Sequence, residues 1–242
     1  TTQLFRVPMQ EITIKAVFFD LDGTFADTAP DLADALNKTL VAHHKQPLQL
    51  EQIRPVVSHG GKALIELGFG IPDSDPEFED LRQELLAYYQ QDLATHTQLF
   101  TGITECLVEL DAQQIKWGIV TNKPGWLTEP LMSSLQLPSR PCSVVSGDTL
   151  QEKKPHPAPL LHACQQCQVE PANAMYIGDA QRDIEAGRRA GMFTVIASYG
   201  YIGQNDDTCN WQADAAIDRP QSLLPLLTSL QNRSEPTDRY AG

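Results

Sequence analysis

The chain has 242 residues, of which 41% are hydrophobic and 20% charged, and its formal net charge is −13. This length is enough for one domain of ordinary size and a smaller one. So acidic a chain disfavours general binding to nucleic acid, and any anion site has to be built locally. No apolar stretch approaches the roughly 20 residues that span a bilayer, and the N-terminus lacks a signal-peptide core, so we expect a cytoplasmic protein without a membrane partner.

Short apolar runs recur along the chain and alternate with helical patterns. Several of these runs lack polar alternation, which is typical of strands buried on both faces. The expected strands are 15–19, 116–121, 143–145, 175–177, 193–197 and 213–217, and the expected helices among them are 103–114, 125–136, 156–168, 180–190 and 220–230. Strand–helix alternation predicts an α/β fold with a Rossmann-like parallel sheet and helices on both of its faces.

The interval after the first expected strand breaks this alternation. Residues 27–97 contain no convincing strand, and their apolar residues recur at helical spacing, with helices expected at 30–44, 50–57, 61–68 and 77–95. We therefore predict a helical domain of residues 27–97 inserted into an α/β core of residues 1–26 and 98–242. The tail 232–242 is polar, and we expect it to fray.

Five cysteines occur at irregular spacing. An odd count without an export signal indicates reduced thiols in a cytosolic protein. Cys164 and Cys167 form a CxxC pattern, but a zinc site needs two further ligands at matching spacing, and the sequence has no second pair. Because both cysteines lie on one face of an expected helix, we interpret them as buried packing residues.

Polar motifs follow four of the expected strands. They are VFFDLDGT with Asp20 and Asp22, IVTN with Thr121 and Asn122, GDTLQEKKPHP with Lys154, and YIGDAQRD with Asp179 and Asp183. Ligands of open α/β sheets bind beyond the carboxyl ends of the strands. We therefore expect these side chains to meet at one edge of the sheet.

This set of side chains suits phosphoryl transfer. Clustered carboxylates repel one another, and Mg²⁺ relieves the repulsion, takes oxygen ligands and bridges to a phosphate. One aspartate of the first motif can attack phosphorus to give an aspartyl phosphate. The other, two residues along, can protonate the leaving oxygen and later deprotonate the attacking water. Thr121 and Lys154 can bind the equatorial oxygens of the phosphoryl group.

Two of these assignments have alternatives. Lys153 could take the role of Lys154, which then becomes a solvated loop residue. Asp183 could cap a helix or pair with Arg182 or Arg188.

Taken together, the four motifs resemble those of the haloacid dehalogenase-like hydrolase superfamily. More closely, TNKP (121–124), KKPHP (153–157), IGDAQRDI (177–184) and SYGY (198–201) are similar to bacterial phosphoglycolate phosphatases. The resemblance implies Asp20 as the nucleophile, Asp22 as the acid and base, and phosphate binding by Thr121 and Lys154. It also implies Mg²⁺ bound by the Asp20 carboxylate, the Asp22 main-chain carbonyl and the Asp179 carboxylate, with Asp183 in support. The insert 27–97 matches the helical cap of the family.

Selection of the substrate must come from the insert, because the motifs handle only the phosphoryl group. Its loop 58–62 offers His59 and Lys62 as donors, and we assign Asn122 to substrate binding as well. The resemblance favours a phosphoglycolate phosphatase that acts on a small phosphorylated metabolite as a monomer or homodimer. The alternatives are a phosphatase for N-acetylmuramic acid 6-phosphate or another sugar phosphate, and a phosphomutase with the same motifs.

Overall fold

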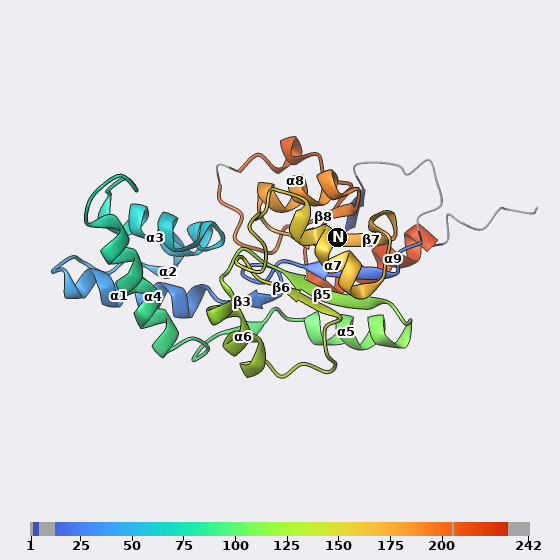
Figure 1. The fold of residues 1–242 in the computed structure, drawn as a ribbon, viewed down its shortest axis with the longest axis horizontal. Coiled ribbons are helices and arrows are strands. Elements are labelled where there is room, and N and C mark those ends of the chain that lie inside the picture. Colours follow the sequence, from blue (N-terminus) through green and yellow to red (C-terminus); the bar gives the residue numbers. More distant parts are fainter. Residues whose placement is uncertain (1, 5–12, 205, 232–242) are drawn as a thin grey trace, which may run out of the picture.

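The computed structural model describes residues 2–4, 13–204 and 206–231, so the expected frayed tail 232–242 lies outside it. A group of helices lies at one end of the long axis and an α/β body occupies the rest (Figure 1). Over these three described ranges, no helix has the length and apolar character that crossing a bilayer requires.

Seven strands form the sheet of the α/β body, in the order β1-β9-β8-β7-β2-β5-β6. Neighbours are parallel except β1 and β9, which are antiparallel. The strands are β1 (Thr2–Leu4), β2 (Ala16–Phe19), β5 (Lys116–Val120), β6 (Ser143–Val145), β7 (Ala174–Gly178), β8 (Phe193–Ala197) and β9 (Ala215–Ile217). The predicted α/β class with a Rossmann-like parallel sheet is confirmed. Among the seven strands of this sheet, only β1 has no counterpart among the expected strands.

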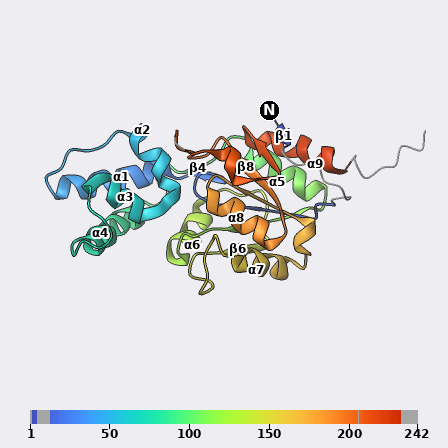
Figure 2. The ribbon, with the colours of Figure 1, turned by 90° about the horizontal axis from the view of Figure 1, so that it is seen from above.

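Helices cover both faces of this sheet. Alternate residues of β2 point to opposite sides: Val17 and Phe19 join an apolar cluster with α5 and α9, and Ala16 and Phe18 join one with α7 and α8. Figures 1 and 2 both place α5 and α7 on opposite sides of the strands. The helices are α5 (Ile103–Ala112), α6 (Gly125–Ser134), α7 (Ala158–Cys167), α8 (Gln181–Ala190) and α9 (Leu223–Gln231), with 3₁₀ turns η2 (Pro171–Asn173), η3 (Thr208–Trp211) and η4 (Pro220–Ser222).

The segment between β2 and β5 builds the second group of helices. It comprises α1 (Ala29–Ala42), α2 (Leu50–Ile53), the 3₁₀ helix η1 (Arg54–His59), α3 (Gly60–Phe69) and α4 (Phe78–Gln91), which ends earlier than expected. These helices share an apolar cluster of their own. Where the chain enters and leaves the group, β3 (Ala26–Asp27) pairs antiparallel with β4 (Gln98–Leu99). The division into a core and a cap at residues 27 and 97 stays a prediction.

The cysteines correct one expectation. Cys142 and Cys167 form a disulfide, with their Cα atoms 5.5 Å apart, so neither is a reduced thiol and Cys167 is not merely a packing residue. The fold brings together the residue before β6 and the last residue of α7, and linear spacing does not reveal that proximity. Cys106, Cys164 and Cys209 are free, and Cys164 is buried as expected.

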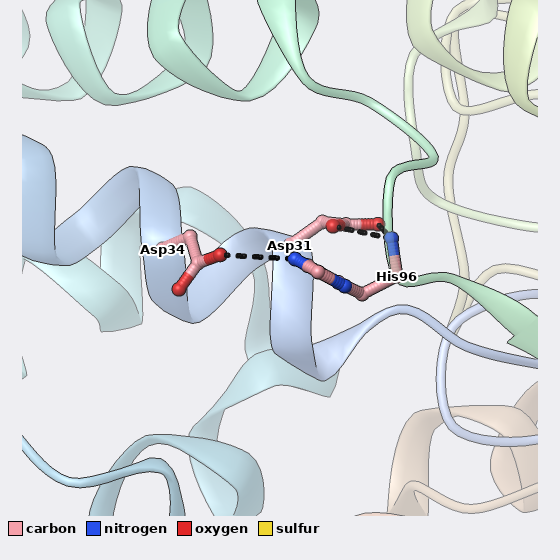
Figure 3. A group of neighbouring side chains, drawn as sticks. All are labelled: Asp31, Asp34 and His96. Atoms are coloured by element: carbon pink, nitrogen blue, oxygen red, sulfur yellow. Dashed lines mark hydrogen bonds and ion pairs between the residues drawn. The ribbon is translucent and has the colours of Figure 1, made fainter.

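Asp31, near the start of α1, ties the entry of the helical group to its exit. Its buried carboxylate accepts hydrogen bonds from the main-chain N–H of His96 and from both the N–H and the hydroxyl of Thr97, at 2.6–3.1 Å. Figure 3 shows Asp34 and His96 beside it, with the Asp34 carboxylate 3.8 Å from the His96 ring. Because the Asp31 oxygens are occupied by these donors, we interpret Asp31 as a structural tie.

Replacing Asp31 with alanine should therefore lower the free energy of unfolding by about 2–4 kcal/mol, because it leaves three donors without their acceptor. Urea denaturation followed by circular dichroism measures this loss. Asp34→Ala is the matched control: its side chain is 58% exposed, so we expect a change below about 0.5 kcal/mol. Equal losses in the two variants would contradict the tie.

Candidate active site

Three of the predicted site residues directly follow neighbouring parallel strands. Asp20 follows β2, Thr121 follows β5 and Asp179 follows β7, and β2 lies between the other two strands. All three side chains are buried at the same sheet edge. The turn after β2 depends on Gly23, whose φ is +83° and whose missing Cβ would lie 2.2 Å from an Asp179 carboxylate oxygen. A side chain there would push apart the first and last motifs.

Lys154 occupies the centre of this edge. Its ammonium group lies 2.9 Å from Asp20 Oδ1 and 2.8 Å from Asp183 Oδ1. It also donates to the Tyr176 hydroxyl at 2.7 Å and to the Val120 carbonyl at 3.0 Å. The side chain is fully buried, so its positive charge acts almost unscreened on the two carboxylates.

Asn122 fixes the backbone that carries this lysine. Its side-chain carbonyl accepts the Lys154 N–H at 3.0 Å, and its amide donates to the Lys154 carbonyl at 2.9 Å. Lys153, the alternative phosphate ligand, is exposed and lines the cavity above the site. Asn122 also lines that cavity, and its predicted contact with substrate stays a prediction.

A triad of buried carboxylates from Asp20, Asp179 and Asp183 could hold a metal ion, since each offers an oxygen within 4.8 Å of the other two. Asp183 also caps α8, because its Oδ2 accepts the Ala180 N–H at 3.0 Å. Its Oδ1 is buried without a hydrogen bond, facing Lys154 outside hydrogen-bond geometry. Asp183 therefore both caps α8 and belongs to the acidic cluster.

The acidic triad holds more negative charge than the two cations beside it, Lys154 and Arg182, offset. Burial, reinforced by Asp20 and Asp183, raises the pKa of Asp179 to about 7. Burial also raises the pKa of Asp20. The charge of Lys154 lowers this pKa, and the charge of Asp183 raises it further. A hard divalent cation with oxygen ligands fits this donor set, because it would compensate three carboxylates that Lys154 and Arg182 do not balance.

Asp22 is held from two sides. Its Oδ1 accepts a hydrogen bond from the Thr28 hydroxyl at 2.5 Å and lies 3.0 Å from the Lys123 ammonium, which also donates to the Tyr89 hydroxyl at 3.0 Å. Burial opposes the charge of Lys123, but Asp22 and Tyr89 outweigh it and raise the pKa of Lys123. Tyr89 belongs to α4, so this lysine connects the helical group to the predicted acid and base.

The 3₁₀ helix η1 of the helical group also reaches the acidic edge, so residues 58–62 are the end of η1 and the start of α3 and not the expected loop. The Ser58 hydroxyl donates to Asp179 Oδ2 at 2.7 Å and lies 3.4 Å from the Asp22 main-chain carbonyl. Arg182 donates to the Ser58 carbonyl, and one of its nitrogens lies 3.4 Å from the His59 ring. Burial and then Arg182 lower the pKa of His59, so the ring is neutral at pH 7.

A cavity of about 720 Å³ separates the sheet edge from the helical group. Asp20, Asp22 and Thr121 line its floor, and the predicted substrate-binding residues His59 and Lys62 line its walls. Lys62 is exposed, 3.4 Å from Asp73. Their contact with substrate stays a prediction.

Sequence reasoning missed four residues of the site: Ser58, Tyr89, Lys123 and Arg182. Lys123 carries a signal, because it stands in the same short motif as Thr121 and Asn122. Arg182 stands within the fourth motif but was considered only as a partner of Asp183. The other two give none: a serine in a helical turn is ordinary, and the tyrosine continues the apolar face of its helix.

Comparison with known proteins identifies relatives over nearly the whole chain. A family model described as "Haloacid dehalogenase-like hydrolase" matches residues 17–197. The N-acetylmuramic acid 6-phosphate phosphatase of Pseudomonas aeruginosa is 40% identical over 219 residues, covering 90% of this chain and 97% of its own. The phosphoglycolate phosphatase of Xanthomonas campestris is 41% identical over 209 residues, covering 86% and 94%. A crystal structure of "a predicted phosphoglycolate phosphatase" from Haemophilus somnus is 26% identical, with a TM-score of 0.78, and covers 90% of this chain and 99% of that one.

The matched segment begins within β2 and ends with β8, so it includes all four motifs and the helical group between the first two. The phosphatases among the relatives confirm the predicted class of enzyme, a phosphoric monoester hydrolase. On these grounds, the chain belongs to the haloacid dehalogenase-like hydrolase family.

Proposed function

We propose that this protein is a Mg²⁺-dependent phosphatase that hydrolyses phosphate monoesters through an aspartyl phosphate on Asp20. The observation that carries the proposal is the meeting of Asp20, Asp179, Asp183 and the buried Lys154 at one sheet edge, below a cavity that Asp22 lines. Mg²⁺, held by the Asp20 and Asp179 carboxylates and the Asp22 main-chain carbonyl, would offset the negative charge of the phosphoryl group and of the site.

The reaction proceeds in two steps. A carboxylate oxygen of Asp20 attacks phosphorus while the bond to the leaving oxygen breaks, and Asp22 gives that oxygen its proton. Asp22 then takes a proton from a water molecule that attacks the same phosphorus, which releases phosphate and restores Asp20. Lys154 and Thr121 hold the equatorial oxygens, where the charge of the transition state lies. Thr28 and Lys123 keep the Asp22 carboxylate oriented toward the cavity.

Two compounds are the first substrates to test, because relatives are named for them: 2-phosphoglycolate and N-acetylmuramic acid 6-phosphate. Both are phosphate monoesters that also carry a carboxylate. Release of inorganic phosphate, measured with Mg²⁺ over a panel that includes both compounds, tests the proposed function. A phosphomutase would convert its substrate without net phosphate release, so the same assay separates it.

Asp20→Asn should abolish turnover, with a loss of at least about a thousandfold in kcat, because an amide does not attack phosphorus. The substitution keeps the size of the side chain, so the melting temperature serves as a check on folding. The exposed Asp111→Asn is the matched control and should retain full activity. Turnover near the wild-type rate in Asp20→Asn would remove Asp20 from the role of nucleophile.

Asp22→Asn should slow poor leaving groups far more than good ones, because only poor ones need a proton as they depart. We expect the loss in kcat for an alkyl phosphate to exceed the loss for p-nitrophenyl phosphate by about tenfold or more. Parallel steady-state assays on the two substrates measure the difference. Equal losses would mean that Asp22 acts only by holding its neighbours in place.

The pKa of Asp179 predicts how pH and Mg²⁺ affect stability. Because the folded metal-free protein keeps this proton up to about pH 7, against 3.8 for an ordinary aspartate, the contribution of Asp179 to stability falls as pH rises between those values. Mg²⁺ competes with the proton, so its half-saturating concentration should be about tenfold lower at pH 8 than at pH 6. Differential scanning fluorimetry with EDTA and a Mg²⁺ titration measures both effects. Asp179→Asn should abolish the difference, and a pH-independent Mg²⁺ response in the wild type would contradict the assignment.

A further inference from the structure

The cavity is far more cationic than the protein around it. Its lining includes five lysine and arginine side chains, namely Lys62, Arg82, Lys123, Lys153 and Arg182, against only two carboxylates, Asp20 and Asp22, although the net charge of the chain is −13. Of the cations, Lys123 is engaged by Asp22, and Arg182 is engaged by the Ser58 carbonyl and the acidic triad. The three cations that remain, Lys62, Arg82 and Lys153, indicate a ligand with more negative charge than one phosphoryl group, since the proposed Lys154 and Mg²⁺ site serves that group.

Two of these cations, Lys62 and Arg82, come from α3 and α4, the helices above the cavity, and not from the sheet edge. Each is held by an exposed acidic partner: Lys62 by Asp73, and Arg82 by Glu79, whose side chain is 60% exposed. The single contact of Lys62 with Asp73, at 3.4 Å, is exchanged at small cost, whereas Arg82 binds Glu79 through two nitrogens, at 2.8 and 2.6 Å, and a carboxylate entering the cavity has to match that bidentate pair. Their position suits an acidic group on the leaving part of the substrate.

Trp126 gives the cavity a flat aromatic surface. It lies in the first turn of α6, and 43% of its surface is exposed. Of the large hydrophobic side chains exposed in the described residues, only Trp126 lines this cavity, and no aromatic ring in those ranges stacks on it. An exposed tryptophan at the wall of a polar cavity is suited to pack against the C–H face of a sugar ring.

The size of the cavity also favours a ring. Its volume of about 720 Å³ falls within the roughly 300–1,000 Å³ of sites that enclose drug-sized ligands. Leu86 and Tyr89 of α4 add apolar surface to the wall formed by the helical group. A two-carbon leaving group held at the sheet edge would leave most of this space filled with water.

We infer that the substrate is the phosphate monoester of a ring-sized sugar that carries a second acidic group, with Trp126 packed against the ring and Arg82 and Lys62 binding the acid. This inference rests on the proposed phosphatase function and narrows its substrate class. It makes Trp126 and Arg82 residues that determine specificity, while the phosphoryl machinery at the sheet edge stays common to all monoesters.

Three phosphate monoesters separate the ring from the acid. N-acetylmuramic acid 6-phosphate has both features, N-acetylglucosamine 6-phosphate has the ring alone, and 2-phosphoglycolate has the acid alone. We expect kcat/KM for the first to exceed that for each of the others by tenfold or more in the wild-type protein. A value for 2-phosphoglycolate equal to or above that for the sugar acid would overturn the inference.

Variants of the two residues test their separate roles. Trp126→Ala should lower kcat/KM for both sugar phosphates by tenfold or more and change the value for 2-phosphoglycolate by less than threefold, and Trp126→Phe should restore most of the loss. Leu161→Ala removes another exposed hydrophobic side chain, outside the cavity, and should change none of the three values. A uniform loss on all three substrates in Trp126→Ala would contradict a ring-binding role.

Arg82→Gln should lower kcat/KM tenfold or more for the sugar acid but less than threefold for the neutral sugar. Its matched control is Arg189→Gln, because Arg189 also pairs with a glutamate on its own helix but lies away from the cavity. Equal loss on the two sugars would contradict acid recognition. If none of the three compounds releases phosphate while p-nitrophenyl phosphate does, the substrate class is wrong but the phosphatase stands; if no monoester releases phosphate, the proposed function fails instead.

Discussion

The structure depends on one buried ammonium group. Lys154 brings its charge between two carboxylates at the centre of the sheet edge, where neither aspartate could stay ionised alone without a large desolvation cost. The third motif therefore has to bring Lys154 to the end of β5, where its ammonium group binds the Val120 carbonyl. The Asn122 side chain holds the motif there through two hydrogen bonds with the Lys154 backbone. The remaining carboxylate, Asp179, forms no salt bridge in the described part of the chain, and its raised pKa supports the proposed site for a divalent ion.

The helical group supplies the upper half of the site and makes direct contacts with its chemical groups. Tyr89 binds the lysine beside Asp22, and Ser58 donates to Asp179. The position of the helices over the sheet is thus linked to the residues proposed to bind the metal and to transfer the proton. A phosphoryl group bound below would be enclosed by groups from both halves of the molecule, which favours exclusion of bulk water during attack.

Much of the fold could be predicted from the sequence, because buried parallel strands appear as unbroken apolar runs and because Asp20 and Asp179 directly follow such runs. The predictions from sequence failed where the outcome depends on residues that are far apart in the chain but close in the fold. Nothing local distinguishes Cys142, which is bonded to Cys167, from a free thiol. In the same way, only the folded chain places Lys154 inside and Lys153 outside. The short strand β1 is specified by its partner β9 and not by its own three residues.

The pairing of β3 with β4 has a consequence for how such enzymes diversify. The chain leaves the α/β body at Ala26–Asp27 and returns beside the same point at Gln98–Leu99. The helices between these two strands therefore do not have to bridge any gap in the sheet. Their sequence and length can change without altering the separation of Asp20 and Thr121. Recognition of the leaving group can therefore change within the inserted helices while the sheet edge keeps its geometry, provided that Ser58 and Tyr89 keep their contacts with Asp179 and Lys123.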